Sequence, residues 1–278
     1  MIRFFKYPGC KLNFVNIINQ EINSTKCKIY IEPFVGSGAV LLNLQNKFDE
    51  YIINDINENI IKIYKSFRDG KYSDLKNLYE MSVKEFGNPG RFKESYYNLR
   101  NALNIKYANT NTLEEGFFYY FIYIRCINGM LRWGKEGFNA AFGFRGYSLE
   151  MSESKFLKIQ SILKKSKIFC QDYKFVFDKE YDNENSLYFL DPPYIETGIN
   201  YGESFNRIEF LELIKNSKGK IIYTDKFNKE VSDYLDWRYV ILRKLNNIHP
   251  GKNRSNKLFD DEVFWTNIEE KYKTARIF

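Results

Sequence analysis

Residues 28–38 read Lys-Ile-Tyr-Ile-Glu-Pro-Phe-Val-Gly-Ser-Gly. The β-branched and aromatic run from Lys28 to Glu32 predicts a strand, and the two glycines that follow it predict a tight turn. We expect a helix from Ala39 to about Asn46, a second strand over Tyr51–Ile53 and a second helix over Glu58–Phe67. This alternation of strands and helices indicates a parallel sheet with helices on its faces.

The pattern changes after residue 70 and returns near residue 166. Helical spacing appears over Phe92–Leu103 and Leu113–Ile124, and Ser152 is the expected N-cap of a further helix. A glycine- and aromatic-rich stretch at 128–147, without helical spacing, is interpreted as a hairpin or an ordered loop. Later strands are expected over Lys167–Gln171, Leu187–Leu190, Lys220–Thr224, Tyr239–Leu245 and Glu262–Trp265, and later helices over Arg207–Asn216 and Glu230–Asp236. The predicted fold is therefore α/β, a doubly wound, mostly parallel sheet (1–70 and 166–278) with a mainly helical insert (71–165).

The first motif that carries chemistry is Glu32-Pro33-Phe34-Val35-Gly36-Ser37-Gly38. Its glycines let the backbone approach a ligand closely. Asp55 ends the next expected strand, where a carboxylate can accept both hydrogen bonds of a ribose diol. Because a Walker lysine and a third glycine are missing, the expected ligand is a nucleoside that need not carry phosphates.

The second motif is Leu187-Tyr188-Phe189-Leu190-Asp191-Pro192-Pro193-Tyr194. Two prolines fix φ and remove two amide donors, so the Asp191 carboxylate and the Pro192 carbonyl remain as acceptors at a rigid turn. The Tyr194 ring offers a stacking face beside them. This arrangement is typical of a receptor for a planar group that bears an NH2. Both motifs follow the carboxyl ends of strands, where doubly wound sheets bind ligands.

Composition narrows the class of protein. The chain has 278 residues, 44% of them hydrophobic, and a formal net charge of +7, which permits a nucleic-acid partner. Scattered cysteines without a CxxC pair, and the single His249, predict that no metal is bound. The N-terminus lacks a sustained apolar stretch, and Gly116–Ile124 is too short to span a bilayer, so we expect a cytoplasmic protein without a membrane partner. Heavy use of Asn, Lys and Ile favours a bacterial or phage-infected bacterial cell.

The order of the motifs resembles that of the Dam-type (D12 class, alpha-group) DNA N6-adenine methyltransferases, over about the whole chain. Tyr7-Pro8-Gly9-Cys10-Lys11 looks like the N-terminal cofactor motif of that family, Glu32–Gly38 like its glycine motif, Asn54-Asp55 like its ribose motif and Asp191–Tyr194 like its catalytic motif. Asn128-Gly129-Met130-Leu131-Arg132, with Phe138-Asn139 and Phe142-Gly143, looks like its DNA-reading hairpin. The fold implied is that of class I S-adenosylmethionine-dependent methyltransferases.

The resemblance implies roles for individual residues. S-adenosylmethionine would be the methyl donor, contacted by Tyr7, Lys11, Glu32, Phe34, Gly36, Gly38, Asp55, Asp172 and Asp191. The catalytic residues would be Asp191, Pro192, Pro193 and Tyr194. Double-stranded DNA would be contacted by Asn128, Met130, Arg132 and Asn139. A cognate restriction endonuclease is an expected partner, and the oligomeric state is a monomer or a weak dimer. Ala141 stands where members that read GATC carry proline, so the target sequence need not carry over.

The expected chemistry is methyl transfer to an exocyclic amine. Two acceptors that hold both N–H bonds of adenine N6 would push the nitrogen toward sp3 geometry and stabilise the developing charge, after the base has left the duplex. The same acceptors suit cytosine N4, so a cytosine-N4 DNA methyltransferase is the alternative. An RNA or protein-amide methyltransferase and a non-enzymatic DNA-binding module also remain open. A cytosine-C5 mechanism is disfavoured because no cysteine follows a proline.

Overall fold

The computed structural model describes residues 1–129, 131–143, 149–193, 205–243 and 261–269. The chain folds into two compact units. Met1–Asn13, Val35–Asn43 and Asn54–Gln171 form the first, called here the helical unit, and Phe14–Phe34, Leu44–Ile53 and Asp172–Phe278 form the second, called the sheet unit. The division into a catalytic domain (1–70 and 166–278) and an insert (71–165) stays a prediction.

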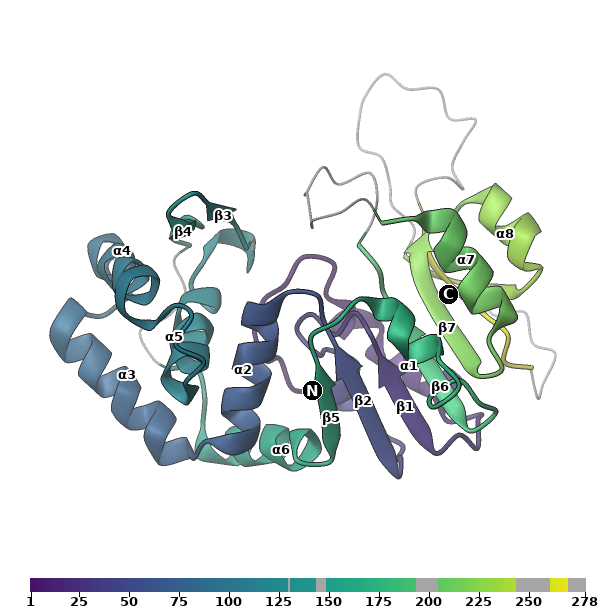
Figure 1. The fold of residues 1–278 in the computed structure, drawn as a ribbon, viewed down its shortest axis with the longest axis horizontal. Helices are drawn as coiled ribbons and strands as arrows, with labels where there is room; N and C mark the ends of the chain where they lie inside the picture. The colour runs from purple at the N-terminus through teal and green to yellow at the C-terminus, as the bar shows by residue number, and fades with distance from the viewer. Residues whose placement is uncertain (130, 144–148, 194–204, 244–260, 270–278) are drawn as a thin grey trace, which may run out of the picture. The chain divides into compact units, whose positions relative to one another are not determined.

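Among the described residues, seven strands form one sheet in the order β5-β2-β1-β6-β7-β9-β8. Figure 1 shows β5, β2, β1, β6 and β7 in this order. The strands are β1 (Ile29–Glu32), β2 (Glu50–Asn54), β5 (Ser166–Phe169), β6 (Ser186–Leu190), β7 (Lys220–Lys226), β8 (Arg238–Arg243) and β9 (Glu262–Thr266). β1 runs parallel to β2 and β6, and β6 runs parallel to β7. β9 is antiparallel to both of its neighbours. The expectation of a mostly parallel α/β sheet is confirmed.

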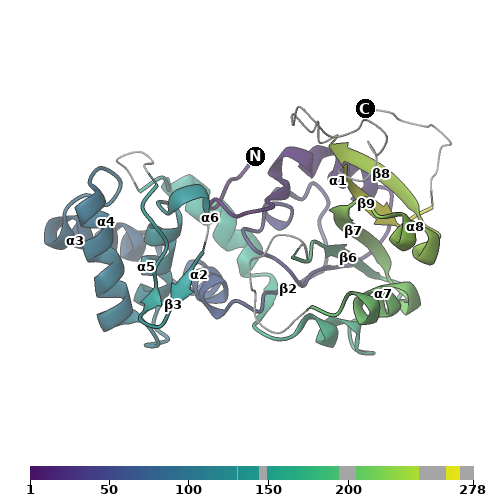
Figure 2. The ribbon, with the colours of Figure 1, turned by 90° about the horizontal axis from the view of Figure 1, so that it is seen from above.

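The central strands are apolar because both faces of the sheet are covered. All five residues of β6 are buried, which is typical of parallel strands with helices on each side. The helices of the sheet unit are α1 (Val15–Ile22), α7 (Arg207–Asn216) and α8 (Lys229–Leu235), with the 3-10 helix η5 (Tyr173–Phe177) before β6. Figure 2 shows α1 and α7 on opposite faces of the sheet. Because β1 and β6 are parallel neighbours, their carboxyl ends lie side by side.

The helical unit is built around α5 (Leu113–Tyr123), which is buried on nearly every side. The other helices are α2 (Glu58–Asp69), α3 (Tyr72–Phe86), α4 (Lys93–Ala102), the π-helical segment η3 (Leu103–Tyr107) and α6 (Glu153–Leu163). Ser152 caps α6 as predicted, since its hydroxyl accepts the Lys155 N–H at 3.3 Å. Within the described ranges, no helix is both long and apolar enough to cross a membrane.

The expected helix from Ala39 to Asn46 is wrong. The structure has only the 3-10 turn η2 (Leu41–Asn43) there. Asn43 supplies the reason, because its side-chain amide donates to the Ala39 carbonyl at 2.9 Å. In an α-helix this carbonyl would accept the backbone N–H of Asn43, so the side chain competes with helix formation. The same side chain also binds both main-chain polar groups of Ile2.

A buried ion pair stabilises the helical unit and yields a first prediction. The Glu115 carboxylate, with a side-chain exposure of 0%, lies 2.8 Å from Lys62 Nζ. It also accepts the backbone N–H groups of Asn109 and Asn111, both at 2.8 Å. Lys62→Met should therefore lower the free energy of unfolding by about 3 kcal/mol, because it leaves a buried charge without its counterion. Urea denaturation followed by circular dichroism measures this loss.

The control for that prediction is Lys76→Met. Lys76 lies 3.8 Å from Glu80 in an exposed pair, and such pairs contribute less than about 1 kcal/mol. Equal destabilisation by the two variants would contradict the role of the buried pair.

Candidate functional site

The loop after β1 and the end of β2 meet within the helical unit. The backbone N–H of Val35 donates to the Asn54 carbonyl at 2.9 Å. The backbone N–H of Gly36 donates to Asp55 Oδ2, also at 2.9 Å. The glycine motif and the carboxylate after β2 are therefore joined directly, although they are separate in the sequence.

Two tyrosines pack against this loop. Gly36 and Gly38 have φ values of +45° and +63°, which favour glycine. The Tyr64 hydroxyl, from α2, donates to the Gly36 carbonyl at 3.1 Å. The Tyr7 ring lies against Gly36, where an added Cβ would come within 3.0 Å of it. Tyr7 was among the predicted residues, whereas Tyr64 was not, because its position in an amphipathic helix gave only the signal of a core residue.

Asp55 is a buried carboxylate with polar neighbours. Its Oδ1 accepts the Asn57 N–H at 2.9 Å, and its Oδ2 accepts Gly36. Burial raises the pKa of Asp55 to about 6, and these two hydrogen bonds only partly oppose the shift. A carboxylate has about four lone-pair positions. Asp55 therefore retains the capacity to accept hydroxyl groups of a ligand.

Lys11 and Asp172, two further residues predicted to contact the donor, form hydrogen bonds with residues close to them in the chain. Lys11 is 2% exposed and its Nζ donates to the Gly9 carbonyl at 2.8 Å. Asp172 is exposed and caps η5, accepting the Lys174 N–H at 2.9 Å. The buried Asn54 side chain exchanges two hydrogen bonds with the main chain of Gln171, at 2.8 and 2.9 Å. Asn54 thus fixes the backbone just before Asp172.

The second motif lies in the sheet unit, directly after β6. The buried Thr224 hydroxyl, from β7, lies 2.7 Å from Asp191 Oδ1 and 3.2 Å from the Leu190 carbonyl, and can donate to either. Pro192 is buried and Pro193 is half-buried. The Asp191 carboxylate is therefore oriented by a neighbouring strand, at the carboxyl edge of the sheet. The sequence did not reveal Thr224, because its contact depends on the register in which β6 and β7 pair.

Aromatic side chains surround Phe34 in the sheet unit. The Phe34 ring lies 5.2 Å from the Tyr173 ring, 6.2 Å from Phe205 and 6.1 Å from Phe210, measured between centroids. Burial raises the pKa of Tyr173 to about 12, so its ring stays neutral. Glu32, buried at the end of β1, accepts the Tyr30 hydroxyl at 2.7 Å. Such a wall of rings is suited to stacking on a planar group.

The hairpin of the helical unit consists of β3 (Trp133–Gly134) and β4 (Gly137–Phe138), which are antiparallel. Arg132 and Asn139 flank it, are exposed, and are joined by a 2.8 Å hydrogen bond from the Asn139 N–H to the Arg132 carbonyl. Asn128 belongs to the 3-10 turn η4 (Ile127–Gly129) before the hairpin. Met130 and Tyr194 lie outside the described residues.

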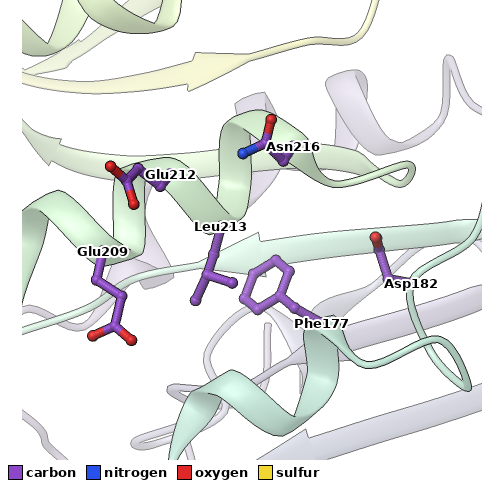
Figure 3. A pocket seen from close by; sticks show the side chains of 6 residues that line it. All are labelled: Phe177, Asp182, Glu209, Glu212, Leu213 and Asn216. Atoms are coloured by element: carbon purple, nitrogen blue, oxygen red, sulfur yellow. The ribbon is translucent and has the colours of Figure 1, made fainter.

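A separate hollow of about 280 Å³ opens between η5 and α7 (Figure 3). Its lining residues are Phe177, Asp182, Glu209, Glu212, Leu213 and Asn216. Glu209 lies 2.7 Å from Lys174 Nζ, and Asp182 accepts the Ser217 hydroxyl at 2.5 Å. The hollow contains none of the residues predicted for the site.

The largely parallel seven-strand sheet, with a glycine loop after β1, a carboxylate after β2 and Asp-Pro-Pro after β6, defines the class I S-adenosylmethionine-dependent methyltransferase fold. The sequence model of the family of D12 class N6 adenine-specific DNA methyltransferases matches residues 7–218 of this chain. The chain belongs to this family.

Curated proteins agree with this assignment. The type II methyltransferase M.MjaIII of Methanocaldococcus jannaschii is 32% identical over 203 residues, which cover 69% of this chain and 68% of that protein. The type II methyltransferase M.CviBI of Paramecium bursaria Chlorella virus NC1A is 26% identical over 84% of this chain and 88% of its own length. A DNA adenine methylase of Haemophilus influenzae is 30% identical over 69% of this chain and 63% of its own length.

The reaction follows from the family. The chain is an enzyme that methylates N6 of adenine at specific sites in DNA, so DNA is its substrate and a methyl donor is required. The prediction of a Dam-type adenine methyltransferase is confirmed. Of the two exocyclic amines that Asp-Pro-Pro-Tyr suits, the family assignment selects adenine N6 over cytosine N4.

Proposed function

We propose that the methyl donor is S-adenosylmethionine and that the loop after β1, together with Asp55, binds its nucleoside part. When bound, this molecule supplies an electrophilic methyl group on a sulfonium. The buried Asp55 carboxylate accepts the ribose hydroxyls, and Gly36 and Gly38 allow the backbone to come close. Tyr7 and Lys11 complete the site from the N-terminal motif. The support is the close packing of this loop in the helical unit, where an added Cβ would lie 3.0 Å from the Tyr7 ring at Gly36 and 2.5 Å from the Tyr64 hydroxyl at Gly38.

In the sheet unit, three further residues are proposed to contact the donor. Phe34 stacks on the adenine of the donor, with Glu32 and Asp172 as polar neighbours. The proposal rests on the aromatic rings around Phe34 and on the place of Glu32, which ends β1 beside β6, with Phe34 two residues further along the chain. Because β1 and β6 are parallel neighbours, these residues and Asp191 share one edge of the sheet.

Asp191 and Pro192 hold the target amine in the proposed mechanism. The Asp191 carboxylate accepts one N–H of adenine N6 and the Pro192 carbonyl accepts the other. This draws the nitrogen lone pair out of conjugation and stabilises the positive charge that develops on N6. Pro193 keeps the turn rigid and Tyr194 stacks on the base. The observation that carries the proposal is the 2.7 Å contact between Thr224 and Asp191 Oδ1, which aims the carboxylate before a substrate arrives.

The substrate is proposed to be double-stranded DNA with its target adenine turned out of the helix. Asn128, Met130, Arg132 and Asn139 would contact the duplex, and Arg132 would form a bidentate contact with guanine O6 and N7. In this proposal residues 71–165 form the target-recognition domain and the remainder forms the catalytic domain. Relatives named type II methyltransferases support a cognate restriction endonuclease as a further partner.

The direct test of this proposal is product analysis. The purified chain is incubated with duplex DNA and S-adenosylmethionine that carries a labelled methyl group, and the DNA is digested to nucleosides. Mass spectrometry should find the label in N6-methyl-2′-deoxyadenosine. Single-stranded DNA of the same sequence serves as the control for the duplex requirement. A label in N4-methyl-2′-deoxycytidine, or no transfer from this donor, would refute the proposal.

Asp55 gives a pH prediction for donor binding. Its pKa of about 6 means that the carboxylate gains a proton as pH falls through 6 and then loses acceptor capacity. We expect the Kd of S-adenosylmethionine, measured by calorimetry, to be constant above pH 7 and to rise below pH 6. Burial, and to a smaller extent the Asp55 charge, raise the pKa values of Tyr123 and Cys170. Neither group therefore ionises between pH 5 and 7.

The control for the pH prediction is Asp55→Asn. This variant cannot titrate at that position and should bind the donor more weakly, with an affinity that changes little between pH 5 and 8. A wild-type-like pH profile in the variant would assign the titration to another group.

A further inference from the structure

The side chain of Asn104 in η3 binds the open edge of the hairpin. Asn104 Nδ2 donates to the Phe138 carbonyl at 2.9 Å. The Phe138 N–H donates back to Asn104 Oδ1 at 3.0 Å. One side-chain amide therefore satisfies both main-chain polar groups of a residue 34 positions away.

The strand pairing explains why this contact matters. Phe138 lies opposite Trp133, and the next pair outward is joined by the hydrogen bond from Asn139 to Arg132. In an antiparallel ladder the bonded and non-bonded pairs alternate, so the N–H and C=O of Phe138 point away from β3. The Asn104 amide thus occupies the place of a third strand. A two-stranded hairpin by itself is only marginally stable in water.

Other side chains of the preceding helix support the same segment. The Tyr96 hydroxyl donates to the Ala140 carbonyl at 3.0 Å, and Arg100 Nη1 lies 3.4 Å from the same oxygen. Tyr96, Arg100 and Asn104 are spaced by four residues, and all three contact the return segment of the hairpin. Asn104 itself lies where the helix becomes π-helical, shown by the bond from the Ala108 N–H to the Leu103 carbonyl at 2.8 Å. Such segments are frequent at functional sites.

We propose that Asn104 is a positioning residue for target recognition, which sets the hairpin so that Arg132 and Asn139 meet the base edges. This inference rests on the proposed function, in which the hairpin reads DNA. Few residues separate Asn104 from the side chains proposed to read DNA. Asn104 fixes the main chain of Phe138; Asn139 follows Phe138 directly, and Arg132 precedes Trp133, the residue paired with Phe138. The buried Phe138 ring, 5.5 Å from the Tyr123 ring, anchors the other side of β4. Asn104 acts on specificity without contacting the DNA.

The test is site selectivity in Asn104→Ala. Single-molecule sequencing of DNA from cells that express the wild-type chain first defines the preferred context. Duplexes with that context, and with one base pair changed, are then compared in kcat/KM. The variant should lose about tenfold in discrimination, which is within the range expected when one bidentate base contact is misplaced. The Kd of S-adenosylmethionine and kcat at saturating preferred DNA should stay within about twofold. Unchanged discrimination would overturn the inference.

The matched control is Asn267→Ala. Asn267 makes the same kind of double contact in the sheet unit, donating to the Gly219 carbonyl at 3.0 Å and accepting the Ile221 N–H at 2.8 Å. This control should lower the melting temperature without altering discrimination. A loss of discrimination equal to that of Asn104→Ala would show a general effect of instability and overturn the inference. Asn104→Asp keeps the acceptor and loses the donor, so it should give an intermediate loss even if the alanine variant fails to fold.

A second comparison separates this inference from the proposed function. If Arg132→Ala changes discrimination and Asn104→Ala does not, the hairpin reads DNA and the inference about Asn104 is wrong. If Arg132→Ala and Asn139→Ala both leave discrimination unchanged, the reading role itself fails. In the double variant Asn104→Ala and Arg132→Ala, the fold-loss in discrimination should be smaller than the product of the two single fold-losses. The reason is that Asn104 acts on discrimination through Arg132. Independent, multiplicative losses would contradict the inference.

Discussion

Asp191→Asn should lower kcat for methyl transfer by about a hundredfold to a thousandfold, the usual effect of removing one electrostatic contact to a developing charge. Asparagine has nearly the same shape as aspartate and can still accept from Thr224, so the fold should be retained. What it lacks is the negative charge that stabilises the cationic N6. Single-turnover transfer of a labelled methyl group to duplex DNA measures the effect apart from product release.

The control for this prediction is Asp182→Asn, in the same unit. Asp182 also accepts a hydroxyl, from Ser217, but belongs to none of the site motifs. It should retain kcat within about threefold, even if its stability falls by about 1 kcal/mol. Activity of Asp191→Asn close to that of Asp182→Asn would show that the carboxylate does not act on the amine. The kcat of Thr224→Val should lie between those of Asp191→Asn and Asp182→Asn. This variant keeps the Asp191 charge but removes the hydroxyl that orients the carboxylate.

Gly38→Ala should weaken binding of S-adenosylmethionine by about a hundredfold. Gly38 has a φ of +63°, and its added Cβ would lie 2.5 Å from the Tyr64 hydroxyl. Either the loop or Tyr64 must move, and Tyr64 would then lose its hydrogen bond to the Gly36 carbonyl. A displacement of about 1 Å in a positioned site can reduce its effectiveness by about 10²-fold. Calorimetric titration of the donor gives the Kd.

The matched control is Gly87→Ala, at the end of α3. Gly87 has a φ of +80°, and a Cβ there would also strike a hydroxyl, that of Ser95. Both variants should lower the free energy of unfolding by about 1–3 kcal/mol from backbone strain, but only Gly38→Ala should change the Kd. If both variants weakened donor binding equally, the effect would come from general instability. Tyr64→Phe, which removes only the hydroxyl, should raise the Kd by a smaller factor, about fivefold.

Much of the sheet was predictable from the types of residues that follow one another in the chain. The strand signals were readable because fully buried parallel strands are continuous apolar runs, as in β6. The carboxylates Asp55 and Asp191 were identified from residue type and from their place after such runs. The place of Asp191 beside the rigid Pro192–Pro193 turn also follows from neighbours in the chain. These features need no knowledge of which distant segments touch.

The residues that orient the site were not predictable in this way. Thr224, Tyr64 and Asn104 are ordinary strand or helix residues until the register of their elements is known. Asn43 is a case in which the local pattern predicted the wrong structure. The residues from Ala39 have a helical pattern, but the Asn43 side chain binds the main chain of Ile2, near the N-terminus, instead of allowing a helix. A side-chain amide or hydroxyl can serve many backbone partners, and only the packed chain selects one.

By itself the sequence determined the alternation of strands and helices, the glycine turn and the pair of acceptors in Asp-Pro-Pro, because each depends on the conformational preferences of adjacent residues. Only the tertiary structure decided that Thr224 aims Asp191, that Tyr64 supports the glycine loop and that Asn104 completes the hairpin. Those contacts join segments far apart in the chain, and their geometry is set by strand register and helix packing, which no local preference specifies.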